Sequence, residues 1–230
     1  MGDVKRPGFI VGLPLEARLI SRAFGPLRPL IHCSGATPSR VAGGVEDLRR
    51  QGADCLISCG FAGGIDGSVG AGDVILADAV VSVEHERFGL DGPLIQRLQS
   101  ALQEAGVVFR TGGMAGVDRI ADSPAGKQAL AAATGAIAVD MESHVLARAG
   151  GGLPIAVLRV VVDPAERAIP AAVLGAMDGN GNIQPLELLA GLARRPSEIG
   201  KLLSLARDHM KARHALKRAV AAVAGVFGES

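Results

Sequence analysis

The run from Pro154 to Val162 restricts the possible folds more than any other part of the sequence. It reads Pro-Ile-Ala-Val-Leu-Arg-Val-Val-Val, so both of its faces are apolar apart from Arg159. A strand of this kind is typical of a sheet that is covered by helices on both sides. Asp163 follows directly, and the ligands of such sheets bind beyond the ends of the strands. The run therefore predicts a covered sheet with a carboxylate at its ligand-binding edge.

Strand-like and helical patterns alternate over most of the chain. The strand-like runs lie at 8–13, 29–33, 54–59, 73–83, 107–112, 135–139 and 154–162. The helical patterns lie at 40–51, around Leu94, Leu98 and Leu102, and at 125–133 and 141–149. This alternation predicts an α/β fold, and only helical patterns follow, at 184–192 and 196–227. We expect a single domain over 1–230, with a mixed central sheet flanked by helices and a mainly helical C-terminal extension over 170–230.

The composition favours one globular core and disfavours some partners. With 230 residues and 48% apolar content, the chain can bury one sizeable core. A formal net charge of +1 and the lack of Trp and Tyr disfavour nucleic acid as a partner. The short apolar run near the N-terminus is broken by Gly and Pro, and no apolar stretch is long enough to span a membrane. We therefore expect a cytoplasmic protein.

The cysteines and histidines predict neither disulfides nor a metal site. Cys33, Cys55 and Cys59 form an odd set without zinc-ligand spacing, and we interpret them as small buried residues in a reducing compartment. The five histidines are spread over the chain without a shared helix face. We expect no metal and no resident cofactor.

Three carboxylates occupy positions where an acid is costly unless it has a function. Glu142 follows the apolar run 135–139, and if it opens a helix it shares a face with apolar residues of the next turns. Asp163 ends the longest apolar run. Glu16 follows another strand exit, where it either serves a site or only stabilises the N-terminus of a helix. These acids predict one crevice at the sheet edge.

Glycine-rich segments follow two of the strand-like runs. They read Gly12-Leu-Pro-Leu-Glu16 and Gly60-Phe-Ala-Gly-Gly64. Glycine lets a ligand approach the backbone closely, because it has no side chain. The second segment lacks the spacing Gly-x-Gly-x-x-Gly, and a long turn follows it instead of a helix. A dinucleotide site is therefore not expected.

Four motifs, taken together and in this order, resemble the nucleoside phosphorylase and nucleosidase superfamily. They are Gly12 to Glu16; Gly60 to Gly64 followed by Val69-Gly-Ala-Gly-Asp-Val-Ile75; Val139-Asp-Met-Glu-Ser143; and Arg159-Val-Val-Val-Asp163. The superfamily contains purine nucleoside phosphorylase and methylthioadenosine/S-adenosylhomocysteine nucleosidase. The tail, with Arg194-Arg-Pro196 and Leu203-Ser-Leu-Ala-Arg207, is similar to a narrower group, the hopanoid-associated phosphorylases or adenosylhopane nucleosidases. The resemblance implies a nucleoside phosphorylase-like fold.

The resemblance also implies cleavage of the bond between a purine and C1′ of ribose. Asp163 corresponds to the general acid that protonates purine N7, and burial would raise its pKa. Glu142 corresponds to the acid that binds the ribose hydroxyls, and Glu16 to the group that activates water at C1′. The implied catalytic residues are Asp163 and Glu16, and the implied substrate-binding residues are Glu142, Met141, Asp140, Phe61, Gly60, Ala62, Arg119 and Ile120.

Two arginines have alternative interpretations. Arg119 stacks on the purine in one interpretation and pairs with Asp118 or Asp122 on the surface in the other. Arg159 lies inside a strand that we expect to be buried. We interpret it as the partner of a carboxylate such as Asp140, in preference to a contact with substrate.

The sequence departs from the superfamily at three positions. Where phosphate-using members have an Arg and a Ser or Thr that bind phosphate, this chain has Ser58 and Phe61. Water is therefore the expected nucleophile, unless Arg18, Arg40 or a neighbouring subunit binds phosphate as a co-substrate. Many nucleosidases have a Ser that contacts the general acid, and Val162 replaces it here, so we expect only backbone or ligand to hold the acid. Phosphorolysis and a non-catalytic nucleoside-binding module stay open as alternatives.

Phe61 and the tail bear on the substrate and the partners. A phenyl ring beside the nucleophile suits a nucleoside with an apolar 5′ substituent, and the narrower resemblance implies adenosylhopane, cleaved to ribosylhopane and adenine in hopanoid biosynthesis.

The basic side chains of the tail are Arg194, Arg195, Lys201, Arg207, Lys211, Arg213, Lys217 and Arg218. Such a helix lies either at the inner face of the membrane or on the sheet with a solvated outer face. The resemblance also implies a homo-oligomer.

Overall fold

A mixed eight-stranded sheet forms the centre of the computed structural model, which describes residues 6–176, 178 and 184–228. The strands are β1 (Pro7–Val11), β2 (Leu30–Cys33), β3 (Cys55–Gly64), β4 (Val74–Ser82), β5 (Arg87–Gly89), β6 (Phe109–Gly116), β7 (Ala138–Asp140) and β8 (Ile155–Asp163). The α-helices are α1 (Pro14–Phe24), α2 (Val41–Arg50), α3 (Gly92–Glu104), α4 (Pro124–Thr134), α5 (Ser143–Ala149), α6 (Ala171–Ala176), α7 (Pro185–Arg194) and α8 (Ile199–Gly228). The predicted fold class, a mixed sheet flanked by helices with a helical C-terminal extension, is confirmed.

Five of the strands pair in a closed ring. β3 pairs with β7, β7 with β6, β6 with β4, β4 with β8, and β8 again with β3. Because both edges of β8 are paired and helices lie over the sheet, its side chains are almost all buried, which explains why the run from Pro154 to Val162 is apolar on both faces. β1, β3 and β8 are parallel. Their carboxyl ends therefore lie at the same edge.

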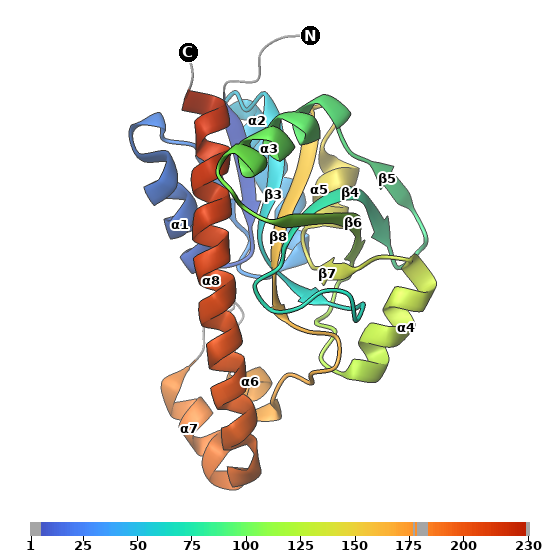
Figure 1. Cartoon of the computed structure of the whole chain (residues 1–230), viewed down its shortest axis with the longest axis vertical. Coiled ribbons are helices and arrows are strands. Elements are labelled where there is room, and N and C mark those ends of the chain that lie inside the picture. Colours follow the sequence, from blue (N-terminus) through green and yellow to red (C-terminus); the bar gives the residue numbers. More distant parts are fainter. Residues whose placement is uncertain (1–5, 177, 179–183, 229–230) are drawn as a thin grey trace.

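Helices cover both faces of the sheet (Figure 1). On one face α1, α3 and α8 pack together, and apolar side chains such as Phe24, Leu98 and Leu216 join those of the strands in the largest core cluster. On the other face α2 and α5 pack against each other, with Val45 and Leu146 in a second cluster. The one-turn leucine spacing predicted the buried face of α3 correctly.

The C-terminal extension consists of α6, α7 and α8. α8 runs along one flank of the molecule, and α6 and α7 lie beside its first turns, at one end beyond the sheet (Figure 1). The second half of α8 buries a row of apolar residues that includes Leu216, Val220 and Val223, whereas α7 has no buried residue. In the part of the chain that the structure describes, no helix combines the length and the apolar character needed to cross a membrane.

The structure corrects several details of the sequence analysis. The helix expected from residue 141 begins at Ser143, and Glu142 is its N-cap. β3 continues to Gly64, beyond the expected end at residue 59, because its pairing with β8 continues. Cys33 is exposed, unlike the other two cysteines, because it ends the edge strand β2.

Candidate active site

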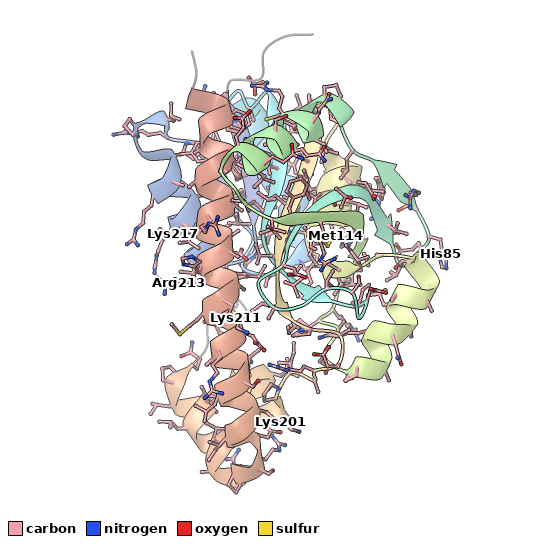
Figure 2. The ribbon with its side chains drawn as sticks, in the orientation of Figure 1. His85, Met114, Lys201, Lys211, Arg213 and Lys217 are labelled. Carbon is pink, nitrogen blue, oxygen red and sulfur yellow. The ribbon has the colours of Figure 1, made fainter. Side chains whose placement is uncertain are left out.

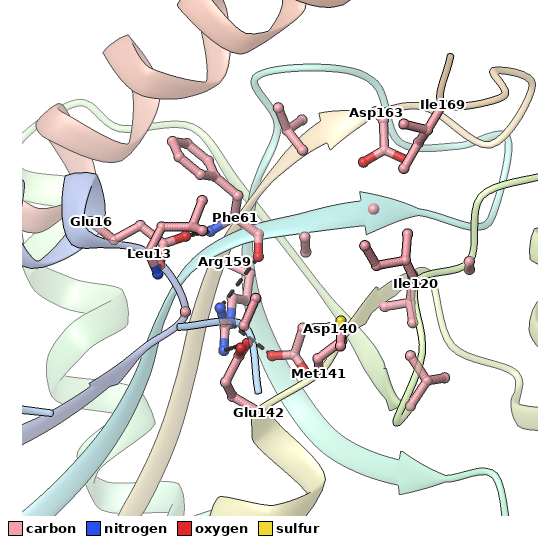
Figure 3. Close-up of a pocket in the computed structure, with 18 residues that line it drawn as sticks. Leu13, Glu16, Phe61, Ile120, Asp140, Met141, Glu142, Arg159, Asp163 and Ile169 are labelled. Carbon is pink, nitrogen blue, oxygen red and sulfur yellow. Dashed lines mark hydrogen bonds and ion pairs between the residues drawn. The ribbon is translucent and has the colours of Figure 1, made fainter. Parts of the chain in front are cut away.

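A cavity of about 190 Å³ opens where β1, β3 and β8 end (Figure 3). Most of the predicted site residues line this cavity: Asp163, Glu16, Glu142, Met141, Asp140, Phe61, Ala62 and Ile120. Gly60 and Arg119 are not among the lining residues. Glu16 and Phe61 lie at one end of the cavity and Asp163 at the other, with Asp140, Met141 and Glu142 between them (Figure 3). The structure therefore brings the three predicted acids to one site.

Glu16 is held by backbone N–H groups of two segments. Its Oε2 accepts a hydrogen bond from the N–H of Leu13 at 2.7 Å, and its Oε1 accepts one from the N–H of Phe61 at 2.7 Å. The first bond stabilises the start of α1, as the structural interpretation of Glu16 expected. Burial raises the pKa of Glu16 to about 7, and the charge of Glu142 adds to the shift, while Arg159 and the two N–H groups oppose it. A carboxyl group with this pKa can accept a proton near neutral pH.

Arg159 connects the two carboxylates in the middle of the site. Its Nε lies 2.7 Å from Oδ2 of Asp140, and its Nη2 lies 3.1 Å from Oε2 of Glu142. The structure thus shows the expected pairing of Arg159 with Asp140 and adds Glu142, whose other oxygen accepts a hydrogen bond from Ser34 at 3.3 Å. Burial raises the pKa of Glu142, and Arg159 opposes this shift. Because each Glu142 oxygen has further lone pairs, this group can still accept hydrogen bonds from a ligand.

Asp163 forms an ion pair with Lys127, a residue of α4 that the sequence analysis did not consider. Nζ of Lys127 lies 2.5 Å from Oδ2 of Asp163, and the Lys127 side chain is fully buried. Nζ also donates to the carbonyl oxygens of Pro164 at 2.8 Å and Arg167 at 3.1 Å. The expectation that only backbone or ligand holds the acid was wrong, because the ammonium group of Lys127, from another element, pairs with its carboxylate. Burial raises the pKa of Asp163 to about 6, although Lys127 opposes the shift.

Two isoleucines form the wall of the cavity beside Asp163. Ile120 follows β6 and Ile169 follows β8, and both lie near Asp163 (Figure 3). The N–H of Ile169 donates to the carbonyl oxygen of Asp122 at 3.0 Å, which joins the two loops. Ile169 was not predicted, because a single Ile in a loop carries no local signal. Two apolar side chains beside an acid suit the flat, largely apolar faces of a heterocycle.

Arg119 lies outside the cavity. Its side chain is exposed, and in the described part of the chain it forms no ion pair with Asp118 or Asp122. Asp118 instead lies 3.2 Å from Nε2 of His144. Neither interpretation of Arg119 is thus seen here, and its contact with a base stays a prediction.

The glycines at the strand exits make room for the carboxylates of the site. A Cβ atom on Gly60 would lie 2.4 Å from Oε1 of Glu16, and one on Gly12 would lie 2.9 Å from Oε1 of Glu142. Both distances are too short for non-bonded atoms. These two glycines therefore leave room for the carboxylates of Glu16 and Glu142. Gly12 also lines the cavity and Gly60 does not, so the close approach of a ligand to the glycine backbone stays a prediction.

Comparison with known proteins identifies the family. A family model described as the phosphorylase superfamily matches residues 15–180. Since this match covers more than half of the chain, the protein belongs to the phosphorylase superfamily. No curated protein sequence matches the chain.

Solved structures of nucleosidases have the same fold. The 5′-methylthioadenosine/S-adenosylhomocysteine nucleosidase from Neisseria meningitidis, in complex with methylthio-immucillin-A, is 18% identical, with a TM-score of 0.71 over 95% of this chain and 98% of that chain. Futalosine hydrolase of Helicobacter pylori strain 26695 is 17% identical, with a TM-score of 0.67 over 94% of this chain and 97% of that chain. At this identity the similarity establishes the nucleoside phosphorylase fold over 94–95% of the chain, as the motifs predicted.

Proposed function

We propose that this protein is a purine nucleosidase that hydrolyses the N-glycosidic bond of a 5′-modified adenosine. The observation that carries the proposal is that Asp163 and Glu16, both with a raised pKa, lie at opposite ends of one cavity. One can donate a proton to a leaving base while the other accepts a proton from water. The similar structures of a nucleosidase and a futalosine hydrolase support this reaction class.

The proposed reaction follows from the positions of the acids. Asp163 donates its proton to N7 of the purine as the bond from C1′ to N9 breaks and its electron pair goes to the base. Glu142 binds the ribose hydroxyls, and its negative charge stabilises the oxocarbenium-like sugar. Glu16 takes a proton from water as the water oxygen adds to C1′. The products are adenine and a sugar with a hydroxyl at C1′.

The pKa values of the two acids predict the pH optimum of the reaction. Asp163, with a pKa of about 6, must be protonated, and Glu16, with a pKa of about 7, must be ionised. Because the acid has the lower pKa of the two, only a minority of molecules carry both groups in the productive form at any pH. We expect a bell-shaped pH dependence of kcat/KM with its optimum between these two values.

The charges around the cavity favour water over phosphate as the nucleophile. Among the described residues that line the cavity, Arg159 is the one cation, and it already pairs with Asp140 and Glu142, while Glu16 lines the cavity as well. Because the negative charges of these carboxylates outnumber the one positive charge of Arg159, they repel a phosphate dianion. Arg18 and Arg40, considered above as substitutes for the missing phosphate site, do not line the cavity. Ser58, which stands where phosphate-using members have an Arg, is buried and accepts a hydrogen bond from Arg159 at 2.5 Å. It therefore offers no positive charge to a phosphate.

For the 5′ substituent we propose an apolar group, with adenosylhopane as the substrate and ribosylhopane and adenine as the products. The cavity of about 190 Å³ is smaller than the ~300–1,000 Å³ of typical ligand pockets, so a large substituent would extend out of it. Phe61, Leu13 and Val162 supply an apolar wall, and the ring of Phe61 packs 5.1 Å from the ring of His209 on α8. This wall supports an exit beside α8. A lipid-linked nucleoside, contact of α8 with a membrane and a homo-oligomer remain proposals.

Product analysis with and without phosphate tests the function. The enzyme is incubated with 5′-methylthioadenosine and with adenosylhopane, and adenine and the sugar are identified by mass spectrometry. We expect adenine release at a rate that phosphate does not change, with one oxygen from labelled water in the sugar. A sugar 1-phosphate would show phosphorolysis instead.

The variant Asp163→Asn separates an enzyme from a nucleoside-binding module. We expect this variant to lose adenine release by at least ~100-fold, since general acid catalysis contributes roughly 10²–10⁴-fold, while it still binds the nucleoside in calorimetry. If the wild-type protein binds nucleosides but never releases adenine, the protein is a binding module and the proposed function is wrong.

A further inference from the structure

Lys127 combines complete burial with a contact to the proposed general acid. It is one of the largest fully buried side chains of the protein and lies on α4, whereas Asp163 ends β8. Burying an ammonium group is unfavourable unless its partners compensate, and an apolar side chain of similar volume would fill the same space without that cost. Packing alone therefore does not account for a lysine at this position.

The partners of Lys127 all belong to one segment. Its ammonium has three protons, and close acceptors for them are Oδ2 of Asp163 at 2.5 Å and the carbonyl oxygens of Pro164 at 2.8 Å and Arg167 at 3.1 Å. Lys127 thus binds both the carboxylate and the loop that follows it. The same loop carries Ile169 of the cavity wall.

Other charged groups near Asp163 are directed elsewhere or border another cavity. Arg167 forms an ion pair with Asp208 of α8, which anchors the loop on its other side. Glu166 and Lys201 line a second cavity that also borders Asp163. Among the described residues, Lys127 is the charged side chain that acts on the pKa of Asp163.

We propose that Lys127 is a positioning residue of the nucleosidase reaction, which orients Asp163 and stabilises the carboxylate that remains when Asp163 has given its proton to the purine. The inference rests on the proposed function. With Oδ2 bonded to Lys127, Oδ1 carries the proton to N7, and Lys127 keeps its three protons throughout. Product release and a proton from water restore the acid. Since the ammonium favours the ionised form of Asp163, it makes Asp163 a stronger acid than burial alone would leave it.

The variant Lys127→Met tests this role through the pH dependence of kcat/KM. Removing the cation raises the pKa of Asp163 by about 1–3 units, the usual effect of one close opposite charge. The optimum lies midway between the two pKa values, so we expect it to move to higher pH by about half that amount. Lys211→Met, a change at an exposed lysine of α8, is the matched control and keeps the wild-type profile.

A substrate with a leaving group that needs no proton provides a second readout. We expect K127M to lose at least ~10-fold in kcat on the adenine nucleoside but little on 4-nitrophenyl riboside, because nitrophenolate departs without general acid catalysis. An equal loss on both substrates with an unmoved pH optimum would mean that Lys127 is only structural, and the inference would be wrong. If wild-type enzyme cleaves neither compound, it is the proposed function that fails.

Lys127→Arg keeps the inference testable if K127M does not fold. The guanidinium retains the positive charge but has a wider, planar donor group than the ammonium. We expect K127R to keep the pH optimum of the wild type while kcat falls. A shifted optimum in folded K127R would contradict the inference, because the charge beside Asp163 is unchanged.

Discussion

Glu16 and Asp163 are both buried acids, but their partners differ in charge. Glu16 accepts hydrogen bonds from two backbone N–H groups, whereas Asp163 pairs with the full positive charge of Lys127. Burial raises the pKa of both, to about 7 and about 6. The stronger partner belongs to the acid that must release its proton, and the weaker partners belong to the acid that must accept one. The two environments therefore agree with the roles proposed for the two residues.

The raised pKa of Glu16 predicts a pH-dependent loss of stability. Between pH 4.5, its value in an unfolded chain, and about 7, folded Glu16 holds a proton that the unfolded chain has released. Stability must therefore fall as the pH rises through this window, by up to about 3 kcal/mol for this group. The variant Glu16→Gln lacks this titration. We expect the free energy of unfolding of the variant, relative to that of the wild type, to increase by this amount between pH 5 and pH 8.

Urea unfolding of both proteins at several pH values measures the effect. The comparison of the pH dependence is more informative than the absolute stability, because the Gln side chain cannot accept both N–H groups and carries a constant cost. A difference between variant and wild type that stays flat from pH 5 to pH 8 would show that Glu16 is ionised throughout.

The end of β3 is shaped by the carboxylate that lies behind it. A Cβ atom at Gly60 would lie 2.4 Å from Oε1 of Glu16, the oxygen that accepts the N–H of Phe61. We expect Gly60→Ala to destabilise the protein by about 1–3 kcal/mol, the usual range for overpacking, and to displace Glu16 with a loss of adenine release. Gly67→Ala in the following turn meets no atom within 4 Å and is the control.

A double-mutant cycle identifies the cause of the loss in G60A. In a Glu16→Ala background the carboxylate is absent, so Gly60→Ala should cost less in thermal or urea unfolding than it does in the wild type. An equal cost in both backgrounds would mean that the strain comes from the backbone of β3, not from Glu16.

The strands and the acids at their ends could be predicted from the sequence, but the lysine that pairs with one of these acids could not. Apolar runs gave most strands, and the positions of Glu16, Glu142 and Asp163 at strand ends gave the acids of the site. Lys127 could not be found in this way, because it lies in the alanine-rich pattern at 125–133, where a lysine is ordinarily solvated. Its burial depends on the loop after β8, which is far away in the sequence. Contacts of this kind are set by tertiary structure and leave no local pattern.

The whole molecule consists of the helix-covered sheet, which carries the site, and a helical lobe at one end. The lobe, formed by α6, α7 and the first turns of α8, lies beyond the sheet (Figure 1). It carries several of the exposed large apolar side chains, among them Leu186, Leu189 and Leu203. Through His209, which contacts Phe61, and Asp208, which pairs with Arg167, α8 connects this lobe to the cavity. A substituent that leaves the cavity beside α8 would therefore approach the lobe.

One face of α8 combines apolar and basic side chains. Ile199, Leu203, Met210 and Lys217 are four and seven residues apart, so they lie on one side of the helix. Leu203 is 56% and Met210 is 72% exposed. Figure 2 shows Arg213 and Lys217 further along the same helix. Basic residues beside exposed apolar ones suit an anionic lipid surface, where each cation near the surface contributes about 1 kcal/mol.

Vesicle binding tests the membrane contact proposed for this face. We expect the wild-type protein to co-sediment with phosphatidylglycerol-containing vesicles in preference to pure phosphatidylcholine vesicles, and less at high salt because the charges are screened. Leu203→Glu combined with Met210→Glu removes two apolar contacts and adds two negative charges, so binding should weaken by at least ~10-fold. Val83→Glu changes an exposed apolar residue between β4 and β5 and should bind like the wild type. The membrane contact is contradicted if the wild type does not bind, or if the double variant binds as strongly as the wild type. This face of α8 is then a solvated helix surface, and the lipid part of the proposal must be abandoned. The chemistry assigned to Asp163 and Glu16 would be unaffected.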